Sequence, residues 1–148
     1  MAQGSEIERV IDQVMQRSRT IAVIGAHVRE HKPAFYVPEY MSARGYRMLP
    51  VNPAFVGREL WGEDVVARVT DLDEAIDGVD VFRRGAAVSE HLEEILSLRP
   101  LPRWVWLQLG IRHDRVAEAL RREGITVIQD RCLLSEHGEW VARGGLRN

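Results

Sequence analysis

Cysteine is nearly absent from this chain of 148 residues, because Cys132 is its single example. One thiol excludes a disulfide framework and a cysteine-based zinc site, and it fits a reducing cytoplasm. Long apolar runs are absent too, since none approaches the ~20 residues that a membrane-spanning helix needs. The acidic, amphipathic segment 1–13 lacks the apolar stretch of a signal peptide. We therefore expect a cytoplasmic protein that does not enter a membrane.

The chain also has no excess of charge of one sign. It carries 20 Lys and Arg against 22 Asp and Glu, for a net charge of −2. This balance argues against a nucleic-acid partner held by a general basic surface. With 45% hydrophobic residues and no internal repeat, the chain is large enough to bury a real core. We expect a single domain over 1–148 with its core at about 20–132.

Apolar runs alternate with helical patterns along the chain. We expect strands at 20–24, 46–51, 80–83, 103–109 and 125–129. We expect helices at 5–17 (with Ser5 as N-cap), 33–44, 71–76, 89–98 and 113–123, and a tail, 130–148, that is mainly loop with one helical turn. Such alternation predicts an α/β fold, a Rossmann-like doubly wound parallel sheet of five main strands with an extra N-terminal helix. Right-handed crossovers favour the strand order 3-2-1-4-5.

The turn after the first strand is the most informative stretch. The apolar run 21–24 stops at Gly25, seven residues follow, and Pro33 opens a helical pattern. A turn of this kind offers free backbone N–H groups and the positive end of a helix dipole, which suits a phosphate. The carboxyl ends of parallel strands lie on one rim of the sheet. We therefore expect a ligand crevice there, at the switch between the first and fourth strands.

This turn lacks the pattern that binds NAD. The dinucleotide fingerprint has three glycines, whereas this chain has only Gly25 in the sequence GAHVRE. Asn52 stands where the second strand of an NAD domain ends in Asp or Glu. Cations are close to the expected rim instead: Arg29, Lys32, Arg58, Arg83 and Arg84. The combination favours a ligand with more phosphate than NAD and without a carboxylate contact to its ribose.

Five segments at the strand ends carry a family resemblance. They read IAVIG at 21–25, GYRMLPVNP at 45–53, VDVFRR at 79–84, WLQLG at 106–110 and DRC at 130–132. Together they resemble the small stand-alone CoA-binding proteins, which are similar to the N-terminal CoA-binding domain of the succinyl-CoA synthetase α subunit. The resemblance covers about 20–132. It implies that CoA phosphates lie on the loop after the first strand and that the next three strand ends line the adenosine and pantetheine path.

The resemblance also implies a set of CoA-binding residues. They are Gly25, Ala26, His27, Lys32, Pro33, Val51, Asn52, Pro53, Phe82, Arg83, Gln108 and Gly110. His27 departs from the family pattern, which often has a small hydroxyl residue there. Arg83 and Arg84 would point to opposite sides of a continuing strand, and we expect Arg83 to face the crevice.

The resemblance implies CoA or acyl-CoA binding without ligase chemistry. The synthetase subunit carries its phosphorylated histidine in a second domain, which this sequence lacks. No G-x-S-x-G, Walker A or H-E-x-x-H motif is present. We therefore expect a non-catalytic CoA-binding protein. The alternative is an enzyme, or an enzyme subunit, that uses acyl-CoA or NAD(P), and a protein partner or homo-oligomer stays open.

The remaining reactive side chains give weaker signals. His27 and His31 have H-x-x-x-H spacing, but that spacing needs a helix to form a metal site and here it falls in a loop. We therefore expect no metal. Cys132 follows Arg131, and we expect a buried, inert thiol rather than a nucleophile. We expect His91, His113 and His137 to be solvated, and Trp104 and Trp106 to pack in the core.

Overall fold

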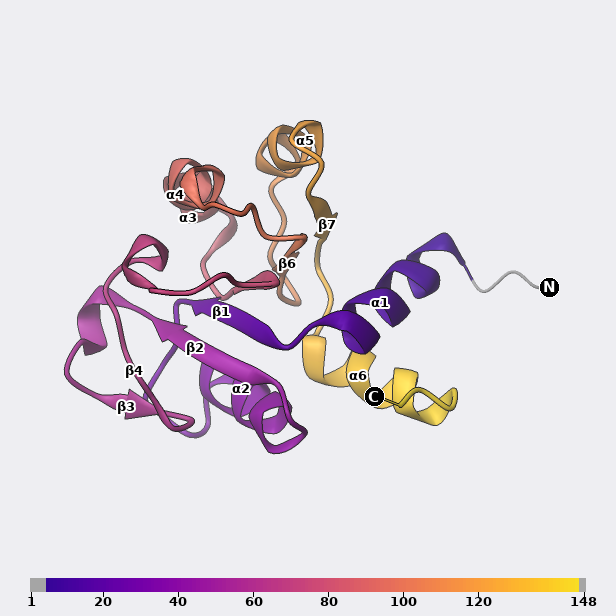
Figure 1. Cartoon of the computed structure of the whole chain (residues 1–148), viewed down its shortest axis with the longest axis horizontal. Coiled ribbons are helices and arrows are strands. Elements are labelled where there is room, and N and C mark those ends of the chain that lie inside the picture. Colours follow the sequence, from indigo (N-terminus) through magenta and orange to yellow (C-terminus); the bar gives the residue numbers. More distant parts are fainter. Residues whose placement is uncertain (1–4, 147–148) are drawn as a thin grey trace.

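A five-stranded parallel sheet forms the centre of the molecule (Figure 1). The computed structural model describes residues 5–146. The strands of the sheet are β1 (Thr20–Ile24), β2 (Arg47–Val51), β5 (Gly78–Val81), β6 (Trp104–Leu107) and β7 (Thr126–Ile128). Their order is β2-β1-β5-β6-β7. A short antiparallel hairpin, β3 (Glu59–Leu60) and β4 (Glu63–Asp64), lies between β2 and β5 in the chain.

Helices cover both faces of this sheet (Figure 1). On one face lie α1 (Glu6–Arg17), α2 (Pro33–Ala43) and α6 (Leu133–Ala142), and on the other lie α3 (Gly85–Val88), α4 (Leu92–Ser97) and α5 (Asp114–Arg122). Side chains alternate along β1, so that Ile21 and Val23 enter the first core while Ala22 and Ile24 enter the second. The Rossmann-like α/β class expected from the sequence is confirmed, including the N-terminal helix.

The N-terminal helix begins as the sequence predicts. Ser5 Oγ accepts the Glu8 N–H at 3.2 Å, and the Glu8 carboxylate accepts the Ser5 N–H at 3.0 Å. This capping box satisfies two backbone donors at the start of α1. Its buried side chains Ile11, Val14 and Met15 fix the helix to the sheet.

The predicted strand order 3-2-1-4-5 is wrong in one place. The third predicted strand, β5, pairs with β1 on the side away from β2. The Asp77 carboxylate contributes to this placement by accepting the N–H groups of Arg19 at 2.7 Å and Thr20 at 3.0 Å. The ligand switch point therefore lies between β1 and β5, and not between the first and fourth strands.

The outer edge of β2 explains why no further strand pairs there. Pro50 has no N–H to give to a neighbouring strand, and proline is confined to such edges. The segment around Val66 occupies this edge instead. Its N–H donates to Pro50 O at 3.1 Å, and its carbonyl accepts from Asn52 N at 2.9 Å. Pro50 was thus a signal in the sequence that β2 is an edge strand.

Three helical predictions need correction. The segment 71–76 is not a helix, because only its first residue belongs to a 3₁₀ turn, Val69–Asp71. The segment 89–98 is broken into a 3₁₀ turn at Ser89–His91 followed by α4. The tail is not mainly loop, since α6 spans ten residues.

The buried face of the C-terminal helix α6 includes a polar residue, so its hydrophobic pattern is weak in the sequence. Leu133, His137 and Trp140 are its buried side chains, at helical spacing i, i+4, i+7. His137 is therefore not solvated as expected, and its Nδ1 lies 3.0 Å from Tyr40 Oη on α2. A polar side chain acting as a core residue, with Gly138 beside it, weakens the hydrophobic pattern that normally marks such a helix.

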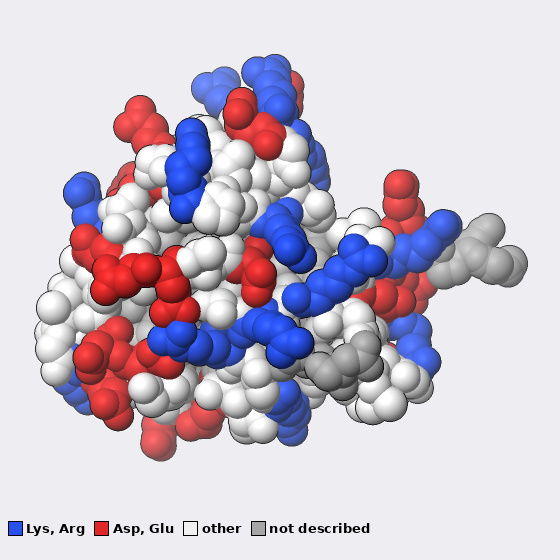
Figure 2. Space-filling view, viewed as in Figure 1, with Lys and Arg blue, Asp and Glu red and all other residues white. Residues whose placement is uncertain are grey.

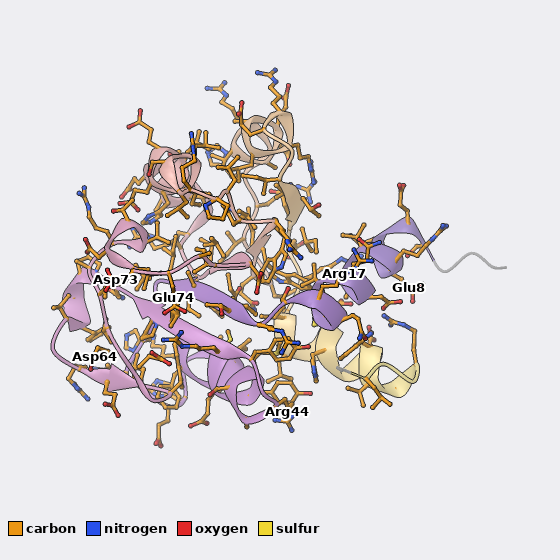
Figure 3. All side chains as sticks on the ribbon, in the orientation of Figure 1. Glu8, Arg17, Arg44, Asp64, Asp73 and Glu74 are labelled. Carbon is orange, nitrogen blue, oxygen red and sulfur yellow. The ribbon has the colours of Figure 1, made fainter. Side chains whose placement is uncertain are left out.

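The visible surface carries interspersed charges of both signs (Figure 2). Acidic side chains from the segment between β2 and β5 contribute to it, among them Asp64, Asp73 and Glu74, while Arg44 extends from the region of α2 and Arg17 from α1 (Figure 3). An anion approaching this molecule would therefore respond to local cations rather than to an overall positive field.

Candidate functional site

The turn after β1 can be made only by glycine. Gly25 has φ = +86°, and a Cβ there would lie 2.4 Å from the carbonyl oxygen of Phe82. Its N–H donates to Val51 O at 2.9 Å. The turn therefore brings the carboxyl ends of β2, β1 and β5 together, and it leaves the backbone of β1 open to close approach by a ligand.

The loop that follows is electropositive. His27 N donates to Ala34 O at 3.3 Å, and His27 Nδ1 accepts the Arg29 N–H at 3.1 Å. Desolvation, followed by the charges of Lys32 and Arg29, lowers the pKa of His27. The loop leads into α2 with Pro33 in the first turn and without a side-chain cap from Lys32. An anion here would meet both local positive charge and the positive end of the α2 dipole.

Two pockets meet at this turn. The larger, of about 540 Å³, lies beyond the ends of β1, β5 and β6, and the smaller, of about 230 Å³, lies beyond β2 and β1. The larger pocket contains the predicted residues Gly25, His27, Lys32, Pro33, Phe82, Arg83, Gln108 and Gly110. The smaller contains Val51, Asn52 and Pro53 together with Gly25 and Arg83. Gly25 and Arg83 line both pockets, so the two pockets adjoin there, and together they are called the trough.

Ala26 is the exception among the predicted residues. It is fully buried and lines neither pocket. Its carbonyl accepts from Asn52 Nδ2 at 2.9 Å, while Asn52 Oδ1 accepts the Ala54 N–H at 2.9 Å. Asn52 therefore ties the turn after β2 to the turn after β1, which is a positioning role for its amide.

The structure adds lining residues that lie outside the predicted CoA-binding set. In the larger pocket they are Ala34, Tyr36, Val37, Arg84, Gly85, Leu109, Ile111 and Cys132, and in the smaller they are Ile24, Ala67, Arg68, His91 and Glu94. Arg84 was expected to face away from Arg83, but both line the larger pocket. The strand ends at Val81, so strict alternation no longer applies, and Arg84 is already the residue that precedes α3.

Unsatisfied polar atoms lie at the wall of the smaller pocket. Arg83 Nε and His91 Nε2 are buried and have no hydrogen-bond partner within residues 5–146. His91 Nδ1 lies 3.3 Å from the carboxylate of Glu94, which can only accept, so in the neutral ring Nε2 is left as an acceptor. The other oxygen of Glu94 lies 3.4 Å from Arg68 Nε. The wall thus offers cations for an anion and one acceptor for a hydroxyl or amino group.

Hydrogen bonds fix the far end of the larger pocket. The buried Gln108 accepts the Leu133 N–H through Oε1 at 3.1 Å, and Gly110 N donates to Asp130 Oδ1 at 2.7 Å. Trp106 Nε1 donates to Arg131 O at 2.7 Å. These bonds hold the segment 130–132 against the end of β6 and bring Cys132 to the pocket wall, so Cys132 is only partly buried and not fully buried as expected.

Among residues 5–146, Asp80 is the one carboxylate buried inside the sheet. It is fully buried on β5, and neither of its oxygens has a hydrogen-bond partner in the described part of the chain. Burial, with a smaller contribution from Cys132, raises the pKa of Asp80 well above its usual range. The Asp80 carboxyl therefore stays protonated, and neutral, at acidic pH values at which exposed aspartates are already ionised.

Within residues 5–146, no group of three or more His, Cys, Asp or Glu side chains is placed to hold a metal ion. None of the described helices is both long enough and apolar enough to cross a membrane.

An open parallel sheet with a trough beyond its carboxyl ends, at a switch point, defines a nucleotide-binding α/β domain. The chain belongs to the CoA binding domain family, whose family model matches residues 19–138.

Three similar proteins share its sequence or its fold. The chain is 34% identical over 128 residues to the uncharacterized protein YneT of Bacillus subtilis (strain 168), covering 86% of this chain and 91% of YneT. It is 48% identical to the solved structure of cell-free ID.343 from Thermus thermophilus, with a TM-score of 0.85 over 89% of this chain and 97% of that one. A hypothetical protein from Pyrococcus horikoshii OT3 shares the fold at 24% identity and a TM-score of 0.84, covering 95% of this chain and 99% of that one.

Asp80→Asn is expected to stabilise the chain at neutral and alkaline pH. Unfolding lowers the pKa of this carboxyl to ~3.9, so between that value and the raised pKa of the folded state the native chain binds the extra proton. Native stability should therefore fall by up to ~1.4 kcal/mol per pH unit in that interval. The asparagine variant should lack this fall, as measured by urea unfolding from pH 4 to 8.

Asp73→Asn, at an exposed acid, is the matched control and should keep the pH profile of the native chain. An unchanged profile in Asp80→Asn would show that Asp80 is ionised in the folded state.

Proposed function

We propose that this chain binds CoA or acyl-CoA in the trough formed by the two pockets. The adenosine part would occupy the smaller pocket, the diphosphate would lie at the junction by Gly25 and Arg83, and the pantetheine arm would follow the larger pocket. The observation that carries this proposal is that both pockets meet at a glycine turn beside an electropositive loop.

The direction of the ligand follows from the fold. In doubly wound sheets the pyrophosphate lies on the first turn and the adenosine ribose lies near the end of the second strand. The smaller pocket is at that strand end, and His91 Nε2 there is available to a ribose hydroxyl or to the adenine amino group. The larger pocket offers Phe82, Leu109 and Ile111 to the uncharged pantetheine arm.

The same geometry argues against NAD as the natural ligand. An NAD site uses a carboxylate at the end of the second strand to accept both ribose hydroxyls. Here Asn52 occupies that place, and both ends of its amide are already bonded to the backbone at Ala26 and Ala54. The cations Arg68 and Arg83 of the smaller pocket match a ligand with an additional phosphate, such as the 3′-phosphate of CoA.

CoA should be preferred over dinucleotides in titration calorimetry. The trough supplies no ribose carboxylate for NAD, and its larger pocket offers apolar walls to a pantetheine arm rather than to a second nucleotide. CoA is therefore expected to bind at least ~10-fold tighter than NAD or NADP, about 1.4 kcal/mol. Arg58→Ala removes an exposed cation that lines neither pocket and serves as the control for general charge. Equal or tighter binding of either dinucleotide would contradict the assignment.

Two arginines should divide the phosphates between them. Arg68 lines only the smaller pocket, so Arg68→Ala should weaken CoA ~10-fold or more and leave dephospho-CoA nearly unchanged. Arg83 lies at the junction, so Arg83→Ala should weaken both ligands alike. The reverse pattern would place the 3′-phosphate at Arg83 and reject the proposed direction of the ligand.

We also propose that binding is not accompanied by catalysis. A cysteine nucleophile needs a base within hydrogen-bond reach, and Nδ1 of the loop residue His27 already accepts the Arg29 N–H at 3.1 Å. Asp80, its buried neighbour, is held neutral and is a poor base below its raised pKa. The rival is an acyl-CoA enzyme, which the place of Cys132 on the pocket wall favours.

The two readings differ in what happens to a bound thioester. Acyl-CoA is incubated with an excess of the protein, and the remaining thioester is measured by liquid chromatography. We expect it to disappear no faster than it does in buffer alone. Catalytic loss that disappears in Cys132→Ala would establish the enzyme instead.

A further inference from the structure

A third pocket continues the trough beyond the larger one. It has a volume of about 440 Å³ and lies past the ends of β6 and β7, at the start of α6. It shares Leu109 and Cys132 with the larger pocket. Its other lining residues are Arg112, Gln129, Asp130, Arg131, Ser135 and Glu136.

The three pockets follow the order of the strands across the sheet. The smaller pocket lies at β2 and β1, the larger at β1, β5 and β6, and the third at β6 and β7. A CoA molecule whose adenosine lies in the smaller pocket would bring its thiol to the end marked by Leu109 and Cys132. Whatever is bonded to that sulfur would extend into the third pocket.

We propose that the third pocket is an acyl site that selects a short acyl group ending in a carboxylate. This inference rests on the proposed CoA function and adds to it the class of acyl group. It makes the physiological ligand the thioester of a short dicarboxylic acid rather than free CoA or a fatty acyl-CoA.

Spare hydrogen-bond donors are the first reason. Arg112 Nε lies 3.1 Å from Asp114 and Arg131 Nη1 lies 3.1 Å from Glu136, so each guanidinium has further N–H groups beyond these contacts. Ser135 adds an exposed hydroxyl. A guanidinium matches the planar shape of a carboxylate and binds it with charge-assisted hydrogen bonds.

The acceptors of the pocket are partly engaged. Glu136 pairs with Arg131 through one oxygen, and one oxygen of Asp130 accepts the Gly110 N–H at 2.7 Å. Gln129 donates to Asp114 at 3.1 Å and accepts the His113 N–H at 2.7 Å. Arg112 and Arg131 both keep N–H groups beyond their ion pairs, so the lining can donate to a ligand group that accepts.

The lining is also too polar for a hydrocarbon chain. Leu109 and Cys132, both at the entrance, are its apolar members. A long acyl chain placed here would gain little from contact with apolar surface and would desolvate the two arginine–carboxylate pairs, which costs free energy.

Calorimetry with matched thioesters tests the proposal. Glutaryl-CoA and pentanoyl-CoA have acyl chains of equal length, and only the first ends in a carboxylate. We expect glutaryl-CoA to bind at least ~5-fold tighter than CoA, about 1 kcal/mol, and pentanoyl-CoA and octanoyl-CoA to bind no tighter than CoA. Arg112→Gln should reduce the glutaryl preference to less than ~2-fold and leave the affinity for CoA unchanged.

Arg115→Gln is the matched control, because Arg115 is exposed on the same helix start and lines none of the three pockets. It should keep the preference for glutaryl-CoA. Equal affinity for all thioesters, tightest binding of octanoyl-CoA, or a glutaryl preference that survives Arg112→Gln would overturn the acyl site while CoA binding stands. Failure of CoA itself to bind would overturn the proposed function and the acyl site together.

Discussion

The close approach of β1 and β5 at Gly25 is the constraint on which the site depends. There is no room for a Cβ between this residue and the Phe82 carbonyl, and its N–H is bonded to Val51 on the opposite side. Three strand ends are thereby held at one point. The two pockets that share Gly25 and Arg83 adjoin at this point.

The second constraint is the termination of the sheet at β2. Pro50 and the segment at Val66 close this edge, so the chain returns to place β5 on the other side of β1. Successive strands are therefore added first on one side of β1 and then on the other, and this switch point lies beside Gly25. Ligands of doubly wound sheets bind at such a switch point. From this point the trough runs across β5 and β6 to α6, with positive charge near its start and more apolar walls in the middle.

Much of the fold and part of the candidate site could be predicted from the sequence, because strands, turns and their ends are local features. The strand at 20–24, the glycine turn and the helix start at Pro33 follow from patterns within a few residues, and the family resemblance supplied eleven of the residues that line the two pockets. Lateral strand order depends on contacts between distant segments, and only Pro50 hinted at it. Arg68, His91 and Glu94 reach the smaller pocket from segments with no strand or motif to mark them. The helix α6 was missed because its buried face includes His137.

The central claim is that one extended ligand lies along the trough in a fixed direction. A crystal structure of the chain with CoA tests it most directly. The account predicts the adenine beyond β2 near His91, the diphosphate within hydrogen-bond reach of the loop after Gly25, and the thiol near Cys132. Density for the nucleotide beyond β6, or outside the trough, would contradict it.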